Sequence, residues 1–174
     1  MINKACYYYE YNKKHFCILQ NSEIQDCNNP CQGYELVCAS AIFLNQMDKL
    51  HKNAMKIKQE PGFEDIVMHS TALYFVNRNA DGKEINISPE EFAETIKIKY
   101  KNRIPNIRLI ACNAGALEGG AAQKLANALN VKVKAPIGPV VVDWNGKMYV
   151  ENALTGETID QKDAWRIFEP RKEK

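Results

Sequence analysis

The feature that most constrains the fold is a strand–helix–strand–helix–strand rhythm over residues 63–135. Short apolar runs there alternate with longer segments of helical period. Such alternation is typical of a mostly parallel sheet flanked by helices, because parallel strands need long crossover connections. The sequence therefore predicts an α/β domain over residues 63–170, in which the strands ending at His69 and Cys112 are parallel neighbours.

Two helices are predicted, one between these strands and one after Cys112. Ser88 is an N-cap, Pro89 takes the first helical position and Glu91 completes a capping box. A pair of glycines at 119–120 precedes the second helix. The side chains expected to face the core are Phe92 and Ile96 in the first helix, with Tyr100 at its end, and Ala122, Leu125, Ala126 and Leu129 in the second.

Shorter strands surround these elements. Residues 72–76 are predicted as a strand after His69, and the alternation over residues 131–135 predicts an edge-like strand. Asn145-Gly146 between two apolar runs predicts a C-terminal β-hairpin. Residues 165–168 are predicted as a final short strand.

The N-terminal part, residues 1–62, has a different composition. Residues 1–34 are rich in Cys, Tyr and Asn without a long period, which predicts irregular structure or short strands. Residues 35–58 carry apolar side chains at alternating steps of four and three, which predicts one amphipathic helix ended by Pro61-Gly62. We expect this Cys-rich segment and helix to pack on the α/β domain, with a coiled-coil seam as the alternative.

Five of the six cysteines lie in the first 38 residues, and Cys112 is alone in the rest. This asymmetry predicts two different roles. The N-terminal group has three interpretations, namely a zinc site, disulfides outside the cytoplasm, or independent reduced thiols. The zinc interpretation uses Cys17, Cys27, Cys31 and Cys38 and leaves Cys6 over.

Charge and hydropathy limit the partners that we expect. The formal net charge is +2, too small to indicate a nucleic-acid or membrane partner by itself. No apolar run has the length that spans a bilayer, and the first residues contain no apolar signal region. We therefore expect no nucleic acid, no membrane and synthesis in the cytoplasm, with export by a signal-independent machine as an open alternative.

His69 and Cys112 are the candidate catalytic pair. Side chains at the carboxyl ends of neighbouring parallel strands meet at one edge of a sheet. A thiol needs a base or a positive field to become a nucleophilic thiolate near neutral pH, and histidine is the usual base. Backbone amides in the loops after both residues would stabilise an oxyanion. The alternative is a buried structural cysteine beside a hydrogen-bonded histidine.

Six sequence blocks follow one another in a distinctive order. They are His69 after a strand, Ser-Pro-Glu-Glu at 88–91, Cys-Asn-Ala-Gly at 112–115, Ala-Gln-Lys-Leu-Ala at 122–126, Val-Lys-Ala-Pro at 133–136 and Trp-Arg-Ile-Phe-Glu-Pro at 165–170. In this order they resemble the caspase-like cysteine-peptidase domains at the C-terminus of bacterial polymorphic toxins. Those domains are related to the self-cleaving peptidase domain of large bacterial toxins.

This resemblance implies a cysteine peptidase in which Cys112 is the nucleophile and His69 the base. Its substrate would be its own chain or a protein of a target cell, and a secretion or immunity protein would be a further partner. The family usually has glycine directly after the histidine, where this chain has Ser70. A catalytically degenerate binding or assembly module is therefore the alternative function.

Further roles follow from the same resemblance. Ser70, Asn113 and Gly115 would lie at the oxyanion site. Asp143 and Trp144 would border the substrate-binding pocket, although a turn acid and a packed aromatic residue suit them equally.

A basic window is the last feature. Residues 97–134 contain eight basic residues against a single acid, Glu118. A solvated helix face and edge-strand lysines account for this window. The alternative is an anionic activator, because toxin peptidases of similar type are switched on by inositol polyphosphate.

Overall fold

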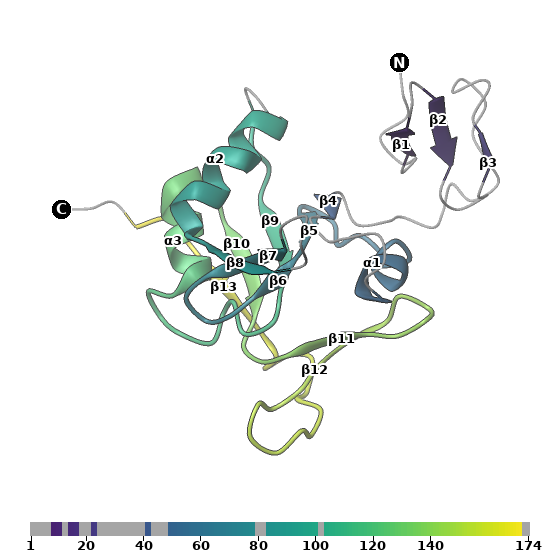
Figure 1. The fold of residues 1–174 in the computed structure, drawn as a ribbon. Helices are drawn as coiled ribbons and strands as arrows, with labels where there is room; N and C mark the ends of the chain where they lie inside the picture. The colour runs from purple at the N-terminus through teal and green to yellow at the C-terminus, as the bar shows by residue number, and fades with distance from the viewer. Residues whose placement is uncertain are drawn as a thin grey trace.

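The computed structural model describes the backbone of residues 8–11, 14–17, 22–23, 41–42, 49–78, 83–100 and 103–171. The first three of these ranges are strands β1 (Tyr8–Tyr11), β2 (Lys14–Cys17) and β3 (Ser22–Glu23). They pair in an antiparallel sheet of their own (Figure 1). Short strands were one of the two structures expected for this Cys-rich segment.

The main sheet has five strands in the order β13-β10-β9-β5-β4. Their bounds are β4 Ala41–Ile42, β5 Glu64–Val67, β9 Ile107–Ile110, β10 Val133–Pro136 and β13 Trp165–Phe168. Strands β4, β5, β9 and β10 run parallel, and β13 is antiparallel to β10. The chain is therefore a mixed α/β protein with a mostly parallel sheet, as the alternating rhythm predicts.

The strands that lead to His69 and Cys112 are parallel neighbours. Glu64 pairs with Ile107 and Val67 with Ile110, so β5 and β9 end together. The chain between them includes α2 (Pro89–Tyr100), and α3 (Ala121–Leu129) connects β9 to β10. This arrangement confirms the predicted neighbours and the two predicted helices.

The two faces of the sheet bury different elements. Alternate strand residues point to opposite faces, so Ile66 and Leu109 meet α2 and α3, whereas Val67 and Ile110 meet the other layer. That other layer comprises α1 (Lys49–Ala54) and the hairpin of β11 (Val140–Val142) and β12 (Met148–Val150). Figure 1 shows α2 and α3 side by side and the hairpin projecting away from them.

A small antiparallel sheet follows β5. It comprises β6 (His69–Ser70), β7 (Phe75–Arg78) and β8 (Glu84–Ile87). Phe75 is fully buried, and its ring lies 4.6 Å from that of Phe92 in α2, centroid to centroid. This contact fixes the small sheet against the helical layer.

Four details differ from the sequence-based expectations. The single helix over residues 35–58 is wrong, because Ala41–Ile42 is a parallel strand beside β5 and the described helix covers only Lys49–Ala54. The strand expected at 72–76 begins at Phe75 instead, and β8 was not predicted. The strand β10 is not an edge, because β9 and β13 flank it. Apolar residues form both a helical stripe and a buried strand, so the pattern over residues 35–58 does not separate the two. The sequence of a strand also does not show which other strand pairs with it.

The predicted capping box at the start of α2 is present. The Ser88 amide donates to a Glu91 carboxylate oxygen at 2.8 Å, and the Glu91 amide donates to Ser88 Oγ at 3.2 Å. The bonds that the Ser88 amide and the Ser88 hydroxyl donate to the carboxylate lower the pKa of the Glu91 carboxyl. Their stabilising effect is therefore present above the unfolded-state pKa of Glu91 and is lost as the pH falls through its lower folded-state pKa.

Replacing Ser88 with alanine should lower the free energy of unfolding by about 0.5–2 kcal/mol, because the N-cap acceptor is lost. Urea unfolding at pH 7 measures this loss. The difference between wild type and S88A should shrink in acid, when Glu91 is protonated in both proteins. A loss that is the same at pH 7 and pH 3 would contradict the reciprocal capping box.

Candidate functional site

Cys112 lies just beyond the carboxyl end of β9. The strand ends at Ile110, Ala111 is buried, and the Cys112 side chain is half-buried against the hairpin layer. The next residue, Asn113, has a φ of +61°, a left-handed conformation that asparagine tolerates better than most residues. The chain therefore turns sharply at the cysteine, as it would in order to present a side chain at the edge of the sheet.

The Cys112 sulfur contacts the first residue of the hairpin. The Val140 amide nitrogen lies 3.4 Å from Sγ, and the Val140 carbonyl oxygen lies 3.9 Å from it. The sulfur therefore both accepts a bond from the Val140 amide and donates one to the Val140 carbonyl. Val140 is a residue that the sequence reasoning missed; its only signal was its position at the start of an apolar run after Gly138-Pro139.

His69 lies in β6, directly after the strand that neighbours β9. Its side chain is half-buried, and its backbone pairs with Val76 of β7. The segment is held to the cysteine segment by two bonds. The Met68 amide donates to the Ile110 carbonyl at 3.3 Å, and Ser70 Oγ donates to the Cys112 carbonyl at 2.6 Å. The structure thus brings the segments of the two candidate catalytic residues into direct contact.

Ser70 therefore has a bonding role in this structure. Its hydroxyl joins the loop after β5 to the loop after β9, and it does so through the backbone of the cysteine itself. A glycine in its place could not make this bond.

The loop after Cys112 is bound on its other side by the chain after β10. The Asn113 amide donates to the Gly138 carbonyl at 2.9 Å, and the Gly115 amide donates to the Pro136 carbonyl at 2.8 Å. Gly115 also permits a close approach, since a Cβ there would lie 2.7 Å from the Ala135 carbonyl oxygen. Two amides proposed as oxyanion donors are thus engaged within the fold in this structure.

An apolar rim adjoins the candidate site. The turn after β6 meets the start of α3, where the Ala121 amide donates to the Ala72 carbonyl at 2.8 Å. Leu73 and Tyr74 on that turn are each 45% exposed, and Leu117 in the cysteine loop is 47% exposed. These three side chains therefore expose apolar surface on the turn after β6 and on the loop after Cys112.

Asp143 and Trp144 lie in the hairpin turn, at the opposite end of β11 from Val140. Asp143 Oδ1 accepts the amides of Asn145 and Lys147 at 2.8 and 2.9 Å, so it stabilises the turn. The Trp144 side chain is 71% exposed, and its carbonyl accepts a bond from Lys56 Nζ at 2.9 Å. The structure places this turn beside α1 (Figure 1) and does not bring either side chain into contact with Cys112.

Several members of the basic window are bound to acids outside it. Arg108 is buried and donates two bonds of 2.6 Å to Asp65. Lys134 lies 2.7 Å from Glu60, and Lys132 lies 2.7 Å from Glu169. Ion pairs with these acids therefore neutralise much of the positive charge of the window.

The zinc expectation falls largely outside the described residues. Cys6, Cys27, Cys31 and Cys38 are not among them, and only the backbone of Cys17 is. Within the part of the chain that the structure describes, no group of three or more histidine, cysteine or acidic side chains is arranged to hold a metal ion. Nor does that part contain a helix of the length and apolarity that a membrane span requires.

Comparison with known proteins gives one family and one distant relative. Residues 39–150 match the model of a domain of unknown function, DUF8616. The chain is also 25% identical over 95 residues to cytoplasmic envelopment protein 2 of Elephantid herpesvirus 1 (isolate Asian elephant/Berlin/Kiba/1998). That alignment covers 53% of this chain but only 26% of the viral protein. Because the family match extends over more than half of the sequence, the chain belongs to the DUF8616 family.

Proposed function

We propose that the chain is a caspase-like cysteine peptidase, with Cys112 as the nucleophile and His69 as the general base. One observation supports this proposal most strongly. The segments that follow two neighbouring parallel strands, β6 after β5 and the loop after β9, hold the histidine and the cysteine, and Ser70 Oγ bonds to the Cys112 carbonyl at 2.6 Å. The sequence blocks that resemble toxin peptidase domains support the same assignment.

The chemistry would proceed in two steps. His69 accepts the thiol proton while the sulfur attacks the peptide carbonyl, and the proton then passes to the leaving amine. Water, deprotonated by His69, next attacks the thioester and releases the acid and the free thiol. The Val140 amide, at 3.4 Å from the sulfur, would stabilise the negative charge that develops on the sulfur as the thiol loses its proton and again as the thioester bond breaks.

The substrate is proposed to be an extended segment of a protein, in this chain or in a target protein. Leu73, Tyr74 and Leu117 give the rim apolar surface, so apolar side chains next to the scissile bond are favoured. The resemblance adds an anionic activator and a secretion or immunity partner to this proposal.

Alkylation of Cys112 tests the first step. At pH 6 a free thiol of pKa about 8.5 is only about 0.3% ionised. We expect iodoacetamide to modify Cys112 at least about tenfold faster than such a thiol, because His69 and the Val140 amide favour the thiolate. Mass spectrometry of the peptide that contains Cys112 separates it from the other cysteines.

Three variants complete this test. H69A should slow the labelling sharply, and C112A should remove peptidase activity while the unfolding transition is retained. V141A, on the exposed face of the hairpin, is the matched control and should leave the rate unchanged. Slow labelling that is the same in wild type and H69A would exclude the catalytic pair.

A non-catalytic binding or assembly module is the second candidate. The amides of Asn113 and Gly115 are engaged by Gly138 and Pro136, and Ser70 stands where the resembled family has glycine. The distant viral relative bears the name of an envelopment protein, which also suits assembly. Fast labelling without peptide cleavage, and without recovery of cleavage in S70G, would favour this second function.

A further inference from the structure

Among the residues that the structure describes, β13 is the last strand of the main sheet, and one row of its backbone groups has no strand partner. The Ile137 amide donates to the Ala164 carbonyl at 3.0 Å, which sets the alternation of the ladder between β10 and β13. In that alternation Arg166 and Phe168 bond to β10, and the backbone groups of Trp165 and Ile167 point outward. Two further contacts agree with this alternation. Pro136, opposite Trp165, turns its carbonyl to Gly115, and the outward Glu169 carbonyl accepts Gln123 Nε2 at 2.8 Å.

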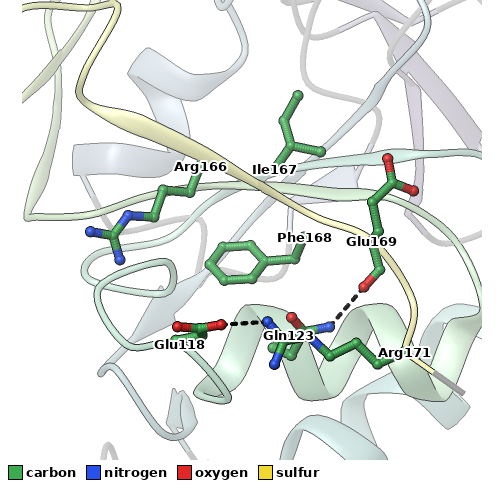
Figure 2. A pocket seen from close by; sticks show the side chains of 7 residues that line it. All are labelled: Glu118, Gln123, Arg166, Ile167, Phe168, Glu169 and Arg171. Atoms are coloured by element: carbon green, nitrogen blue, oxygen red, sulfur yellow. Dashed lines mark hydrogen bonds and ion pairs between the residues drawn. The ribbon is translucent and has the colours of Figure 1, made fainter.

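A groove of about 580 Å³ follows this edge. Its lining includes four consecutive residues, 166–169, together with Glu118, Gln123 and Arg171 (Figure 2). Consecutive strand residues face opposite sides of a sheet, so a groove that touches all four runs along the backbone edge. Figure 2 shows the strand passing over α3, with Phe168 and Gln123 between them.

The side chains of α3 already bind the chain that follows β13. Gln123 is 3% exposed and bonds to the Glu169 carbonyl, and Asn127 Oδ1 accepts the Arg171 amide at 2.8 Å. These two contacts satisfy backbone groups after Phe168. The outward groups of Ile167, whose side chain is 56% exposed, receive no such contact from α3.

The charges along the groove leave one cation uncompensated. Glu118 pairs with Arg171 at 2.6 Å, and Glu169 pairs with Lys132 at 2.7 Å. Arg166 is exposed and reaches only the Ala116 carbonyl, at 3.5 Å, with no ion pair among the residues that the structure describes. An occupant with an acidic side chain near Arg166 would complete the charge balance of the groove.

We propose that the outer edge of β13 is a docking site for an extended peptide strand that carries an acidic side chain opposite Arg166. The peptide would add a sixth strand to the sheet, bonding to the backbone of Trp165 and Ile167 and placing its acid against the guanidinium. This site is independent of Cys112 and of the proposed peptidase activity.

Panning the full chain against phage-displayed random nine-residue peptides tests the proposal. The enriched peptides are then synthesised, and their dissociation constants are measured by fluorescence anisotropy. We expect their aligned sequences to share Asp or Glu at one position, and we expect the bound peptides to slow amide hydrogen exchange at Ile167. Their affinity for C112A should equal that for wild type, which separates this site from the candidate active site.

Two variants should remove the two sources of affinity. I167P deletes an outward N–H that β10 does not use, so the ladder is kept and peptide affinity should fall at least about tenfold. R166Q should weaken binding about three- to tenfold and reduce its dependence on salt. I167T keeps the N–H and is the matched control, with affinity expected within about twofold of wild type.

Other outcomes would overturn the proposal. These are a panning experiment that enriches no peptide, or enriched peptides that bind I167P as tightly as wild type. If the enriched peptides contain no acidic residue and bind R166Q as tightly as wild type, the proposed pairing of an acidic side chain with Arg166 is wrong. Self-association that I167P abolishes, without peptide enrichment, would assign the edge to a second copy of the chain. If I167P does not fold, the hydrogen exchange of Ile167 in wild type decides alone.

Discussion

Replacing Arg108 with methionine is expected to lower the free energy of unfolding by about 3–5 kcal/mol, because Asp65 would remain buried without its cation. Asp65 is fully buried, and the Arg108 guanidinium holds both of its carboxylate oxygens at 2.6 Å. The same guanidinium bonds to the Lys58 carbonyl at 2.8 Å and to Glu60 at 3.2 Å. It therefore joins β5, β9 and the segment before β5, and methionine can make none of these bonds.

The stability of R108M is also expected to change with pH in a defined direction. Burial raises the pKa of the Asp65 carboxyl, and the bonds from Arg108 lower it in part. Without Arg108 the folded-state pKa rises further above the unfolded-state value. The stability of R108M should then be greatest at low pH and decline as the pH rises through the folded-state pKa of Asp65.

Urea unfolding at several pH values measures both effects. The matched control is the double variant D65L/R108M, which replaces the pair by apolar groups and should recover most of the loss. If the double variant is as unstable as R108M, the loss comes from the Lys58 and Glu60 contacts and not from the lost ion pair between Arg108 and Asp65.

G138A is expected to cause the second large effect. A Cβ on Gly138 would lie 2.0 Å from the Glu151 carbonyl oxygen and 3.3 Å from Val150 Cγ1, so the hairpin has to move. We expect a loss of about 1–3 kcal/mol in the free energy of unfolding, as for other overpacked sites. Because the Gly138 carbonyl also accepts the Asn113 amide, the movement should disturb the cysteine loop and slow the alkylation of Cys112.

The matched control for G138A is G156A. Gly156 has a φ of +72°, and a Cβ there meets no atom within 4 Å, so only backbone strain is added. That strain costs about 1–2 kcal/mol and should leave the Cys112 labelling rate unchanged. Equal labelling rates in the two variants would show that the Gly138 contact does not position the cysteine loop.

Local sequence signals predicted most of the core elements. The capping box of Ser88 and Glu91 fixed the start of α2, and the inward residues expected for α3 are all buried. Asn145-Gly146 identified the hairpin turn, where Gly146 has a φ of +82°. These signals succeed because each depends on residues a few positions apart, where backbone conformation and side-chain chemistry are directly coupled.

Contacts between distant residues could not be predicted in the same way. Arg108 was counted as part of a basic window, yet it is neutralised by Asp65, 43 positions earlier. Val140 reaches the Cys112 sulfur only because the chain after β10 folds back over β9. Ser70 was noted as a departure from glycine, but its bond to the Cys112 carbonyl required the register of β5 and β9. No local pattern contains this register.

The position of β13 has a practical consequence for preparing this protein. The family match ends at residue 150, the last residue of β12, whereas the sheet is completed by residues 165–168. A chain cut at the family boundary would expose the inner strand β10 and remove Phe168 from the core beneath α3. An exposed edge strand with unpaired backbone groups promotes aggregation. An expressed fragment should therefore run through residue 171, where Asn127 binds the last described amide.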